Sequence, residues 1–138
     1  MKSGCQIYVK GSVEAAALYQ KAFNLVPGMT ALNDDGTYEH LSLMSGENEI
    51  IAIAEDKLDY HDDKVGRGKC PVMSFNVYDF NTKEEVDHAY AVLSEGARWN
   101  ENPDGPGAPV WDKEGDGDVY GFSLMDKFGV HWGVMIFL

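Results

Sequence analysis

Two segments with a β-type pattern of apolar and polar residues dominate the chain, one at the end of each half. Residues 37–56 and 118–137 each contain two β-type runs joined by four turn-forming residues, Ser45–Asn48 and Asp126–Gly129. The tripeptide Ser42-Leu43-Met44 recurs 81 residues later as Ser123-Leu124-Met125. A repeat of this length predicts two supersecondary units of the same plan rather than an array of many repeats.

The first unit is predicted to open with a strand and a helix. A short strand over Gln6–Lys10 stops at Gly11, and Ser12 is a suitable N-cap for a helix that continues to Phe23. Pro27-Gly28 is expected to end this segment. A second strand, over about Met29–Leu32, then leads into a turn at residues 33–36.

The second unit repeats this plan from Val72 onward. The pattern predicts a strand over Val72–Phe80, followed by a capping box, Thr82-Lys83-Glu84-Glu85, that opens a helix. The helix carries one apolar stripe and is expected to stop at Gly96. A short strand, Ala97–Asn100, follows it.

Pairing each hairpin across a four-residue loop predicts which side chains share a face, because directly opposed residues point to the same side of a sheet. In the first hairpin the mixed face then carries Tyr38, His40, Ser42, Ile51, Ile53 and Glu55, and the apolar face carries Leu41, Leu43, Ile50, Ala52 and Ala54. In the second, one face carries Gly121, Ser123, Trp132 and Val134, and the other carries Phe122, Leu124, His131, Gly133 and Met135. We expect the second set of each hairpin to lie under a helix, which gives His131 a weaker claim to a site than His40.

Two segments that show neither the helical nor the strand period of apolar residues separate these elements. Residues 56–69 are polar and charged, and we interpret them as a solvated linker, although Asp59, His61, Asp62 and Asp63 invite comparison with a metal site. Residues 100–117 are rich in proline and glycine and contain Trp111. So long a loop predicts a lid in which Trp111 contacts a ligand, or a loop that Trp111 merely anchors. Its acidic residues start a calcium-loop spacing, but the closing acid is absent because Ser123 stands there.

Length and charge restrict the class of protein. A chain of 138 residues suits a single domain, made of two repeats (about 5–56 and 70–138), with its own core. The formal net charge of −12 disfavours binding to nucleic acid or to anionic membranes. The chain shows no apolar leader, and its two cysteines are expected to be thiols, so we predict a cytoplasmic protein.

The order of several short motifs resembles the vicinal oxygen chelate superfamily of glyoxalase I, bleomycin-resistance proteins and extradiol dioxygenases. The resemblance is strongest to its PhnB-like branch, also labelled demethylubiquinone methyltransferase-like. It rests on residues 9–16, Leu18-Tyr19, Ala22-Phe23, His40, Tyr120-Gly121 and Asp126-Lys127-Phe128-Gly129-Val130-His131-Trp132, in which Lys127 replaces the family's usual proline.

This resemblance implies an α+β fold of two β-α-β-β-β repeats, with curled mixed sheets, helices outside and a cup inside. The mixed faces then become the lining of the cup. The resemblance also implies a homodimer, which would cover sheet edges that two short sheets leave open.

The candidate chemistry is a small-molecule site. The sequence contains no nucleophile elbow, phosphate loop or dinucleotide fingerprint. It therefore leaves the catalytic residues unknown. His40 and Ser42, with Tyr8, Tyr38 and Glu55 nearby, form a few polar groups in an apolar cup. We therefore predict that a small, partly apolar molecule contacts His40, Ser42, Tyr38, Trp111, Ser123 and Trp132. The alternative is a metal-dependent lyase, isomerase or dioxygenase.

The positions that the resemblance assigns to metal ligands decide between these two hypotheses. The final-strand positions are Val134 and Ile53, and the first-strand positions fall near Gly4 and Val72. None of these side chains can bind a divalent cation, and His40 with Glu55 could supply at most two ligands, whereas catalytic zinc typically has three from the protein. We therefore predict no metal, no cofactor, and no glyoxalase or extradiol dioxygenase activity.

Overall fold

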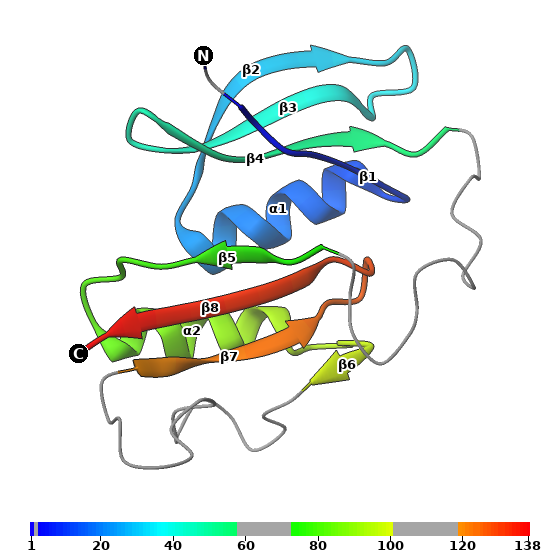
Figure 1. Cartoon of the computed structure of the whole chain (residues 1–138). Coiled ribbons are helices and arrows are strands. Elements are labelled where there is room, and N and C mark those ends of the chain that lie inside the picture. Colours follow the sequence, from blue (N-terminus) through cyan, green and yellow to red (C-terminus); the bar gives the residue numbers. More distant parts are fainter. Residues whose placement is uncertain (2, 58–72, 101–118) are drawn as a thin grey trace. The chain divides into compact units, whose positions relative to one another are not determined.

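The computed structural model describes residues 1, 3–57, 73–100 and 119–138, which form two compact units, Met1–Val65 and Gly66–Leu138. Each unit contains one helix and one four-stranded mixed sheet (Figure 1). The predicted α+β class with two β-α-β-β-β units is confirmed. Whether the units form a single domain stays a prediction, and the expectations for residues 58–69, residues 101–117 and Trp111 lie outside the described residues.

The N-terminal unit has the strand order β1-β4-β3-β2, with β1 parallel to β4 and the other pairs antiparallel. The prediction that Pro27-Gly28 lies before the second strand is wrong, because both residues belong to β2. A proline is tolerated there because β2 is an edge strand with one unpaired side. The elements are β1 (Gln6–Val9), α1 (Ser12–Phe23), β2 (Val26–Leu32), β3 (Tyr38–Ser45) and β4 (Asn48–Glu55).

The C-terminal unit repeats this topology in the order β5-β8-β7-β6, with β5 parallel to β8. In Figure 1, α2 runs behind β7 and β8. The elements are β5 (Phe75–Val77), α2 (Lys83–Leu93), β6 (Trp99–Asn100), β7 (Val119–Met125) and β8 (His131–Phe137).

The two helices begin in different ways. As predicted, Thr82 caps α2: its hydroxyl accepts from Glu85 N, and the Glu85 carboxylate accepts from Asn81 N. The prediction that Ser12 caps α1 is wrong, because the N-cap is Gly11 with a φ of 84°, a left-handed conformation in which glycine carries no Cβ penalty. The orphan N–H groups are satisfied instead by Glu55 of β4, which accepts from Gly11 N at 3.0 Å and from Ser12 N at 2.6 Å.

The first hairpin pairs as predicted only next to its turn. Met44 opposes Glu49, but Leu43 opposes Ile51 because a β-bulge at Ile50 shifts the register by one residue. A shift of one residue exchanges the faces of the whole strand. The prediction that Ile51 and Ile53 share a face with Ser42 is therefore wrong, and Ala52 takes that place.

The second hairpin is also shifted by one residue, because its turn contains five residues rather than four. Met125 opposes His131, so Val130 stays in the turn, where its N–H and C=O both bond to Asp126. Ser123 consequently opposes Gly133, and Leu124 opposes Trp132. The predicted faces of Trp132 and His131 are both wrong: Trp132 belongs to the helix side and His131 to the opposite side.

Each sheet buries one face against its own helix. In the N-terminal unit the core joins Leu41, Leu43, Ile51 and Ile53 to the α1 residues Ala15, Ala16, Tyr19 and Ala22. In the C-terminal unit it joins Phe122, Leu124, Trp132 and Val134 to the α2 residues Val86, Ala89 and Leu93. The opposite face of each sheet, here called its open face, carries the remaining side chains and with them the candidate chemistry.

Candidate functional site

The open face of the N-terminal sheet brings together residues from three neighbouring strands. Gln6 and Tyr8 of β1 lie beside Ala52 and Ala54 of β4, and Ser42 of β3 lies on the other side of Ala52. His40 shares the face of Ser42, because alternate residues of a strand point to the same side. Parallel pairing of β1 with β4 thus places Gln6 near His40, although 34 residues separate them in the sequence.

Five polar side chains on this face form a continuous hydrogen-bonded chain, here called the polar row. Gln6 Nε2 donates to Tyr8 Oη at 3.0 Å, and Gln6 Oε1 lies 2.7 Å from His40 Nδ1. On the other side of the imidazole, His40 Nε2 lies 3.1 Å from Ser42 Oγ. The Ser42 hydroxyl donates to Glu49 Oε2 at 2.5 Å, a short distance typical of a bond to a carboxylate.

Burial changes along the polar row. Ser42 is 4% exposed, His40 is half-buried, and Tyr8 at the other end is 55% exposed. The alanines between these groups, Ala52 and Ala54, are buried and leave a low apolar floor between β1 and β3. The row therefore has a buried point at Ser42 and two exposed ends, the Tyr8 phenol and the Glu49 carboxylate.

The structure brings together some of the predicted site residues but not all of them. His40, Ser42 and Tyr8 come together as predicted, and Tyr38 shares their face by strand alternation. Glu55 does not join them, because it belongs to the α1 side and binds the start of the helix. Burial acts to raise the pKa of Glu55, but the hydrogen bonds from Gly11 and Ser12 outweigh it and hold that pKa below its usual value.

Sequence reasoning missed two members of the row, Gln6 and Glu49. Gln6 required the parallel register of β1 against β4, which no local pattern reveals. Glu49 was placed correctly opposite Met44, but its hydrogen bond with Ser42 was not predicted.

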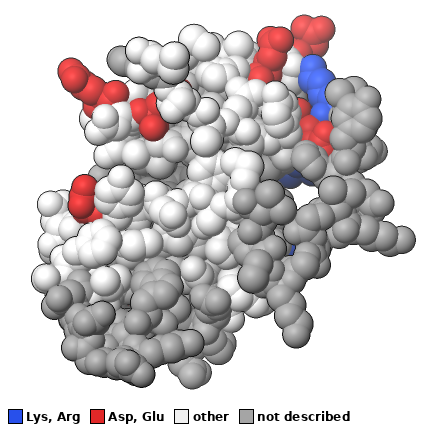
Figure 2. Space-filling view, in the orientation of Figure 1, with Lys and Arg blue, Asp and Glu red and all other residues white. Residues whose placement is uncertain are grey.

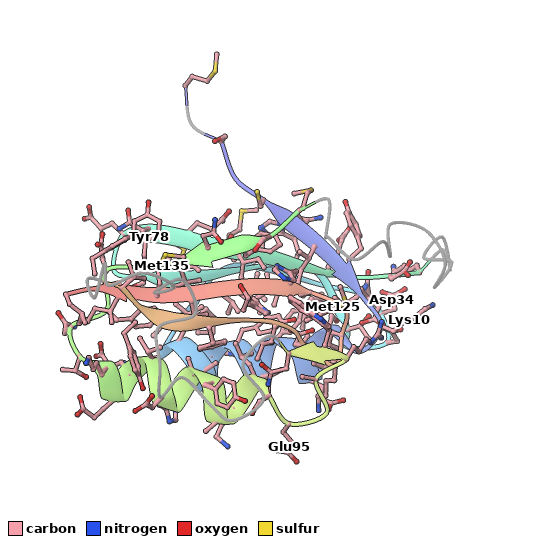
Figure 3. The ribbon with its side chains drawn as sticks, turned by 60° about the horizontal axis from the view of Figure 1, so that its bottom comes forward. Lys10, Asp34, Tyr78, Glu95, Met125 and Met135 are labelled. Atoms are coloured by element: carbon pink, nitrogen blue, oxygen red, sulfur yellow. The ribbon has the colours of Figure 1, made fainter. Side chains whose placement is uncertain are left out.

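The open face of the C-terminal sheet carries a different set of side chains. Ser123 lies beside Gly133 there, together with Gly121, Met125 and Met135. His131 Nδ1 lies 2.8 Å from Ser74 Oγ, and its ring stacks on Trp99 with centroids 5.4 Å apart. Figure 3 shows Met125 and Met135 towards opposite ends of the paired strands β7 and β8, with Glu95 beyond the end of α2 on the helix side.

Trp132 is fully buried in the core of the C-terminal unit and does not line an open face. Its indole Nε1 donates to Asp126 Oδ2 at 2.9 Å, while Asp126 Oδ1 accepts from Phe128 N and Val130 N. The motif from Asp126 to Trp132 is thus a self-contained turn whose buried carboxylate positions both backbone and indole. Its role in this chain is structural.

The described residues do not fit a catalytic metal. They contain no group of three histidine, cysteine, aspartate or glutamate side chains that could hold an ion. Both ring nitrogens of His40 already face Gln6 and Ser42, and Ile53 and Val134 are buried on the helix sides.

Figure 2, drawn from the side of Figure 1, shows a surface that is mostly uncharged over the described residues, with more acidic than basic groups. Within the described parts of the chain, no helix is long and apolar enough to span a membrane.

Comparison by sequence finds no match among family profiles or curated proteins. Comparison by structure finds relatives that cover nearly the whole chain. A protein from Pseudomonas aeruginosa aligns with a TM-score of 0.67 and 17% identity, over 99% of this chain and 97% of its own. A PhnB protein from Bacillus cereus aligns with a TM-score of 0.65 and 18% identity, over 99% of both chains. The chain has the glyoxalase-type fold.

A third structure with the glyoxalase-type fold is the fosfomycin resistance protein FosX from Listeria monocytogenes, solved with manganese(II) and sulfate. It aligns with a TM-score of 0.57 and 13% identity, over 100% of this chain and 93% of its own. At such identities the likeness concerns the fold, and the residues of the open face have to be interpreted from their own chemistry.

Proposed function

We propose that this chain is a PhnB-like member of the vicinal oxygen chelate superfamily that binds a small, partly apolar molecule without a catalytic metal. The observation that supports this proposal is the polar row itself, a set of mutually bonded polar groups beside buried alanines on the N-terminal open face. A few fixed polar groups in apolar surroundings are the usual composition of a small-molecule site.

The arrangement favours binding over metal-assisted catalysis. A metal-bound water or substrate needs ligands that converge on one point, usually three from the protein. Here the single imidazole of the row is bonded on both sides, and the carboxylate of the row, Glu49, is reached through the Ser42 hydroxyl. These groups rigidify one another and present a fixed surface.

We also propose that the protein is a cytoplasmic homodimer. Among the described residues, the edge strand β2 has a strand partner on one side only, and it exposes Val26, Met29 and Leu32 by 56%, 69% and 59%. Exposed apolar edges favour association. Light scattering at micromolar concentration is expected to give twice the chain mass, and Met29→Lys to shift it toward the monomer. A monomeric wild-type mass would contradict the dimer.

The test of ligand binding uses the internal repeat as its control. A library of neutral, partly apolar fragments carrying carbonyl, amide or hydroxyl groups is screened by nuclear magnetic resonance against untagged protein. We expect hits to shift the signals of Gln6, His40 and Ser42, and their affinity to fall in Ser42→Ala but not in the repeat-equivalent Ser123→Ala. Hits that ignore Ser42→Ala would place the site elsewhere.

Native mass spectrometry of the same untagged preparation tests the metal-dependent alternative. Stoichiometric zinc, nickel, manganese or iron that is lost in His40→Ala would replace the binding proposal with a metal-dependent lyase, isomerase or dioxygenase.

A further inference from the structure

Among the described residues, Glu49 is a carboxylate with no basic partner on the open face of the N-terminal sheet. Glu49 opposes Met44 of β3, and Met44 shares its face with Ser42 because alternate residues of a strand point to the same side. The four strands of this sheet contain no lysine or arginine. Within the described parts of the chain, the one hydrogen bond to the Glu49 carboxylate comes from the Ser42 hydroxyl. The sheet therefore leaves the negative charge of Glu49 uncompensated.

The Glu49 carboxylate is exposed, but the sheet fixes its orientation. Its Oε2 accepts from the Ser42 hydroxyl at 2.5 Å, and Ser42 is 4% exposed. The same hydroxyl oxygen lies 3.1 Å from His40 Nε2. Exposed ion pairs are weak partly because two long side chains lose rotamer freedom when they meet. Ser42 already restricts Glu49 in the folded protein, so a cation that binds there meets a preorganised partner.

Two glycines leave space on either side of this carboxylate. A Cβ on Gly4, which precedes β1, would lie 3.0 Å from Glu49 Oε1 and would crowd it. A Cβ on Gly28 of β2 would lie 2.8 Å from Met44 Cγ and 3.1 Å from Met44 Sδ. The Met44 side chain therefore extends over β2, on the far side from β4, because residue 28 has no side chain there.

We propose that Glu49 binds an ammonium group of the ligand, and that the apolar part of the ligand packs on Met44 and on the alanines of the open face. This inference rests on the proposed function of that face and adds the charge of the ligand. A primary ammonium group has three N–H donors and no acceptor, and it complements a carboxylate that accepts a single bond from Ser42. The flexible thioether of methionine packs against apolar groups of varied shape. The ligand class is a small amphiphilic amine.

The open face fits an amine better than a metal ion or a neutral donor. A metal ion needs several ligands, and the described residues contain no group of three side chains that could hold one. A neutral N–H donor would form the hydrogen bond but leave the charge of Glu49 unpaired. The formal net charge of −12 also raises the concentration of cations at the surface of the protein.

The first test compares three small aromatic probes, benzylamine, which is a cation near neutral pH, benzyl alcohol, which is neutral, and benzoate, which is an anion. Nuclear magnetic resonance measures their binding to untagged protein at low ionic strength. We expect benzylamine to bind about twofold to fivefold more tightly than benzyl alcohol, the factor of an exposed ion pair, and benzoate to bind most weakly. Added salt should reduce this preference because it screens exposed charges. Equal affinities for benzylamine and benzyl alcohol would overturn the inference.

Glu49→Gln shows whether this carboxylate carries the preference. The variant removes the charge and keeps an acceptor for the Ser42 hydroxyl, so it should abolish the preference for benzylamine over benzyl alcohol. Glu47→Gln, in the adjacent turn, is the matched control, because it changes the net charge equally and should leave the preference unchanged. An equal loss in both variants would mean that benzylamine responds only to the net charge, which would overturn the inference.

Gly28→Ala tests where the apolar part of the ligand lies. The new Cβ would push the Met44 side chain from its place over β2, so the affinities for benzylamine and benzyl alcohol should fall by the same factor. In a Met44→Ala background, Gly28→Ala should have no further effect, because two substitutions that act through one contact are not additive. A loss that persists without the Met44 side chain would overturn the predicted contact with Met44.

The screen of neutral fragments separates a failure of this inference from a failure of the proposed function. If neutral fragments shift the signals of Gln6, His40 and Ser42 but benzylamine does not, the inference is wrong and the proposed function stands. If neither the fragments nor the three probes shift these signals, the proposed function fails on this face as well.

Discussion

The two sheets have the same topology but use the same positions of their open faces for different purposes. Ser42 and Ser123 are equivalent in the repeat, whereas His40 is matched by Gly121 and Ala52 by Gly133. A Cβ on Gly121 would lie 2.2 Å from the Val134 carbonyl oxygen, and one on Gly133 would lie 2.5 Å from Asn76 Oδ1. The C-terminal sheet brings neighbouring groups into the space that side chains of the polar row occupy in the N-terminal sheet.

The turns of the two hairpins also differ in how they use polar side chains. Asp126 is buried and bonds to two backbone N–H groups and to the Trp132 indole, whereas its repeat equivalent, Ser45, is exposed beside a two-residue turn. The C-terminal repeat thus concentrates its polar bonding in a structural turn, and the N-terminal repeat concentrates it on the open face. A shared fold therefore leaves the two repeats free to specialise.

The largest effect is expected from removing the buried carboxylate of Asp126. Asp126→Ala leaves two backbone donors and the indole N–H of Trp132 without an acceptor, which should lower the free energy of unfolding by about 3 kcal/mol or more. Urea denaturation followed by tryptophan fluorescence measures this change.

Two variants control the Asp126 experiment. Asp126→Asn keeps the oxygen that serves the backbone and loses only the indole bond, so it should cost clearly less than alanine. Ser45→Ala at the equivalent exposed position should change the stability by less than about 0.5 kcal/mol. Equal losses at residues 126 and 45 would contradict the contrast between the two turns.

The second prediction concerns the open faces. Gly121→Ala forces a Cβ against the β8 backbone and should destabilise the protein by about 1–3 kcal/mol, whereas His40→Ala at the equivalent position should cost less because that side chain is half-buried. Thermal unfolding of both variants gives the order. A greater loss for His40→Ala would show that the polar row stabilises the fold more than we infer.

Much of the fold followed from local patterns, because turns, capping boxes and alternation act over a few residues. The capping box at Thr82, the turn at residues 33–36 and the repeat itself all appear where they were predicted. The predicted faces were right for β3 and β7 but wrong for β4 and β8, because one inserted residue in each hairpin shifts the second strand completely. The alternation of apolar and polar residues shows neither the bulge at Ile50 nor the fifth residue of the turn, Val130.

The candidate site was predictable only in part for the same reason. His40 and Ser42 alternate on one strand, so their proximity followed from the sequence. Gln6 joins them through parallel pairing of β1 with β4, and Trp132 left the predicted set because of the register shift. Contacts between distant strands and single-residue register changes limit what a single sequence can predict.

The third prediction compares the two helix starts. Glu55→Gln and Thr82→Ala should each lower stability by about 1 kcal/mol near neutral pH, since each removes a cap. The folded-state pKa of Glu55 lies below its usual 4.5, so its contribution is present above pH 4.5 and is lost as the pH falls through the folded value. The penalty of Glu55→Gln should therefore shrink in acid while that of Thr82→Ala stays constant. If urea titrations give the two variants the same pH dependence of stability, the assignment of Glu55 as the cap of α1 is wrong.

The smallest effect is expected at the contact between β7 and α2. The residue equivalent to Tyr120 in the N-terminal unit is Glu39, which is exposed. The Tyr120 hydroxyl donates to Asp87 Oδ1 at 2.5 Å, and burial together with this bond raises the pKa of Tyr120 from 10.0 to about 12. Because the folded state retains this proton longer than the unfolded chain, the stabilisation is complete below pH 10 and is lost between pH 10 and 12. Tyr120→Phe should cost less than about 1 kcal/mol at neutral pH, and this penalty should shrink across that alkaline interval. Asp87→Asn is the matched control, because it keeps the Tyr120 hydroxyl but removes the carboxylate charge. It should therefore narrow the pH interval over which the stabilisation is lost. An alkaline stability profile that is the same in wild type and Tyr120→Phe would show that this contact does not stabilise the second unit.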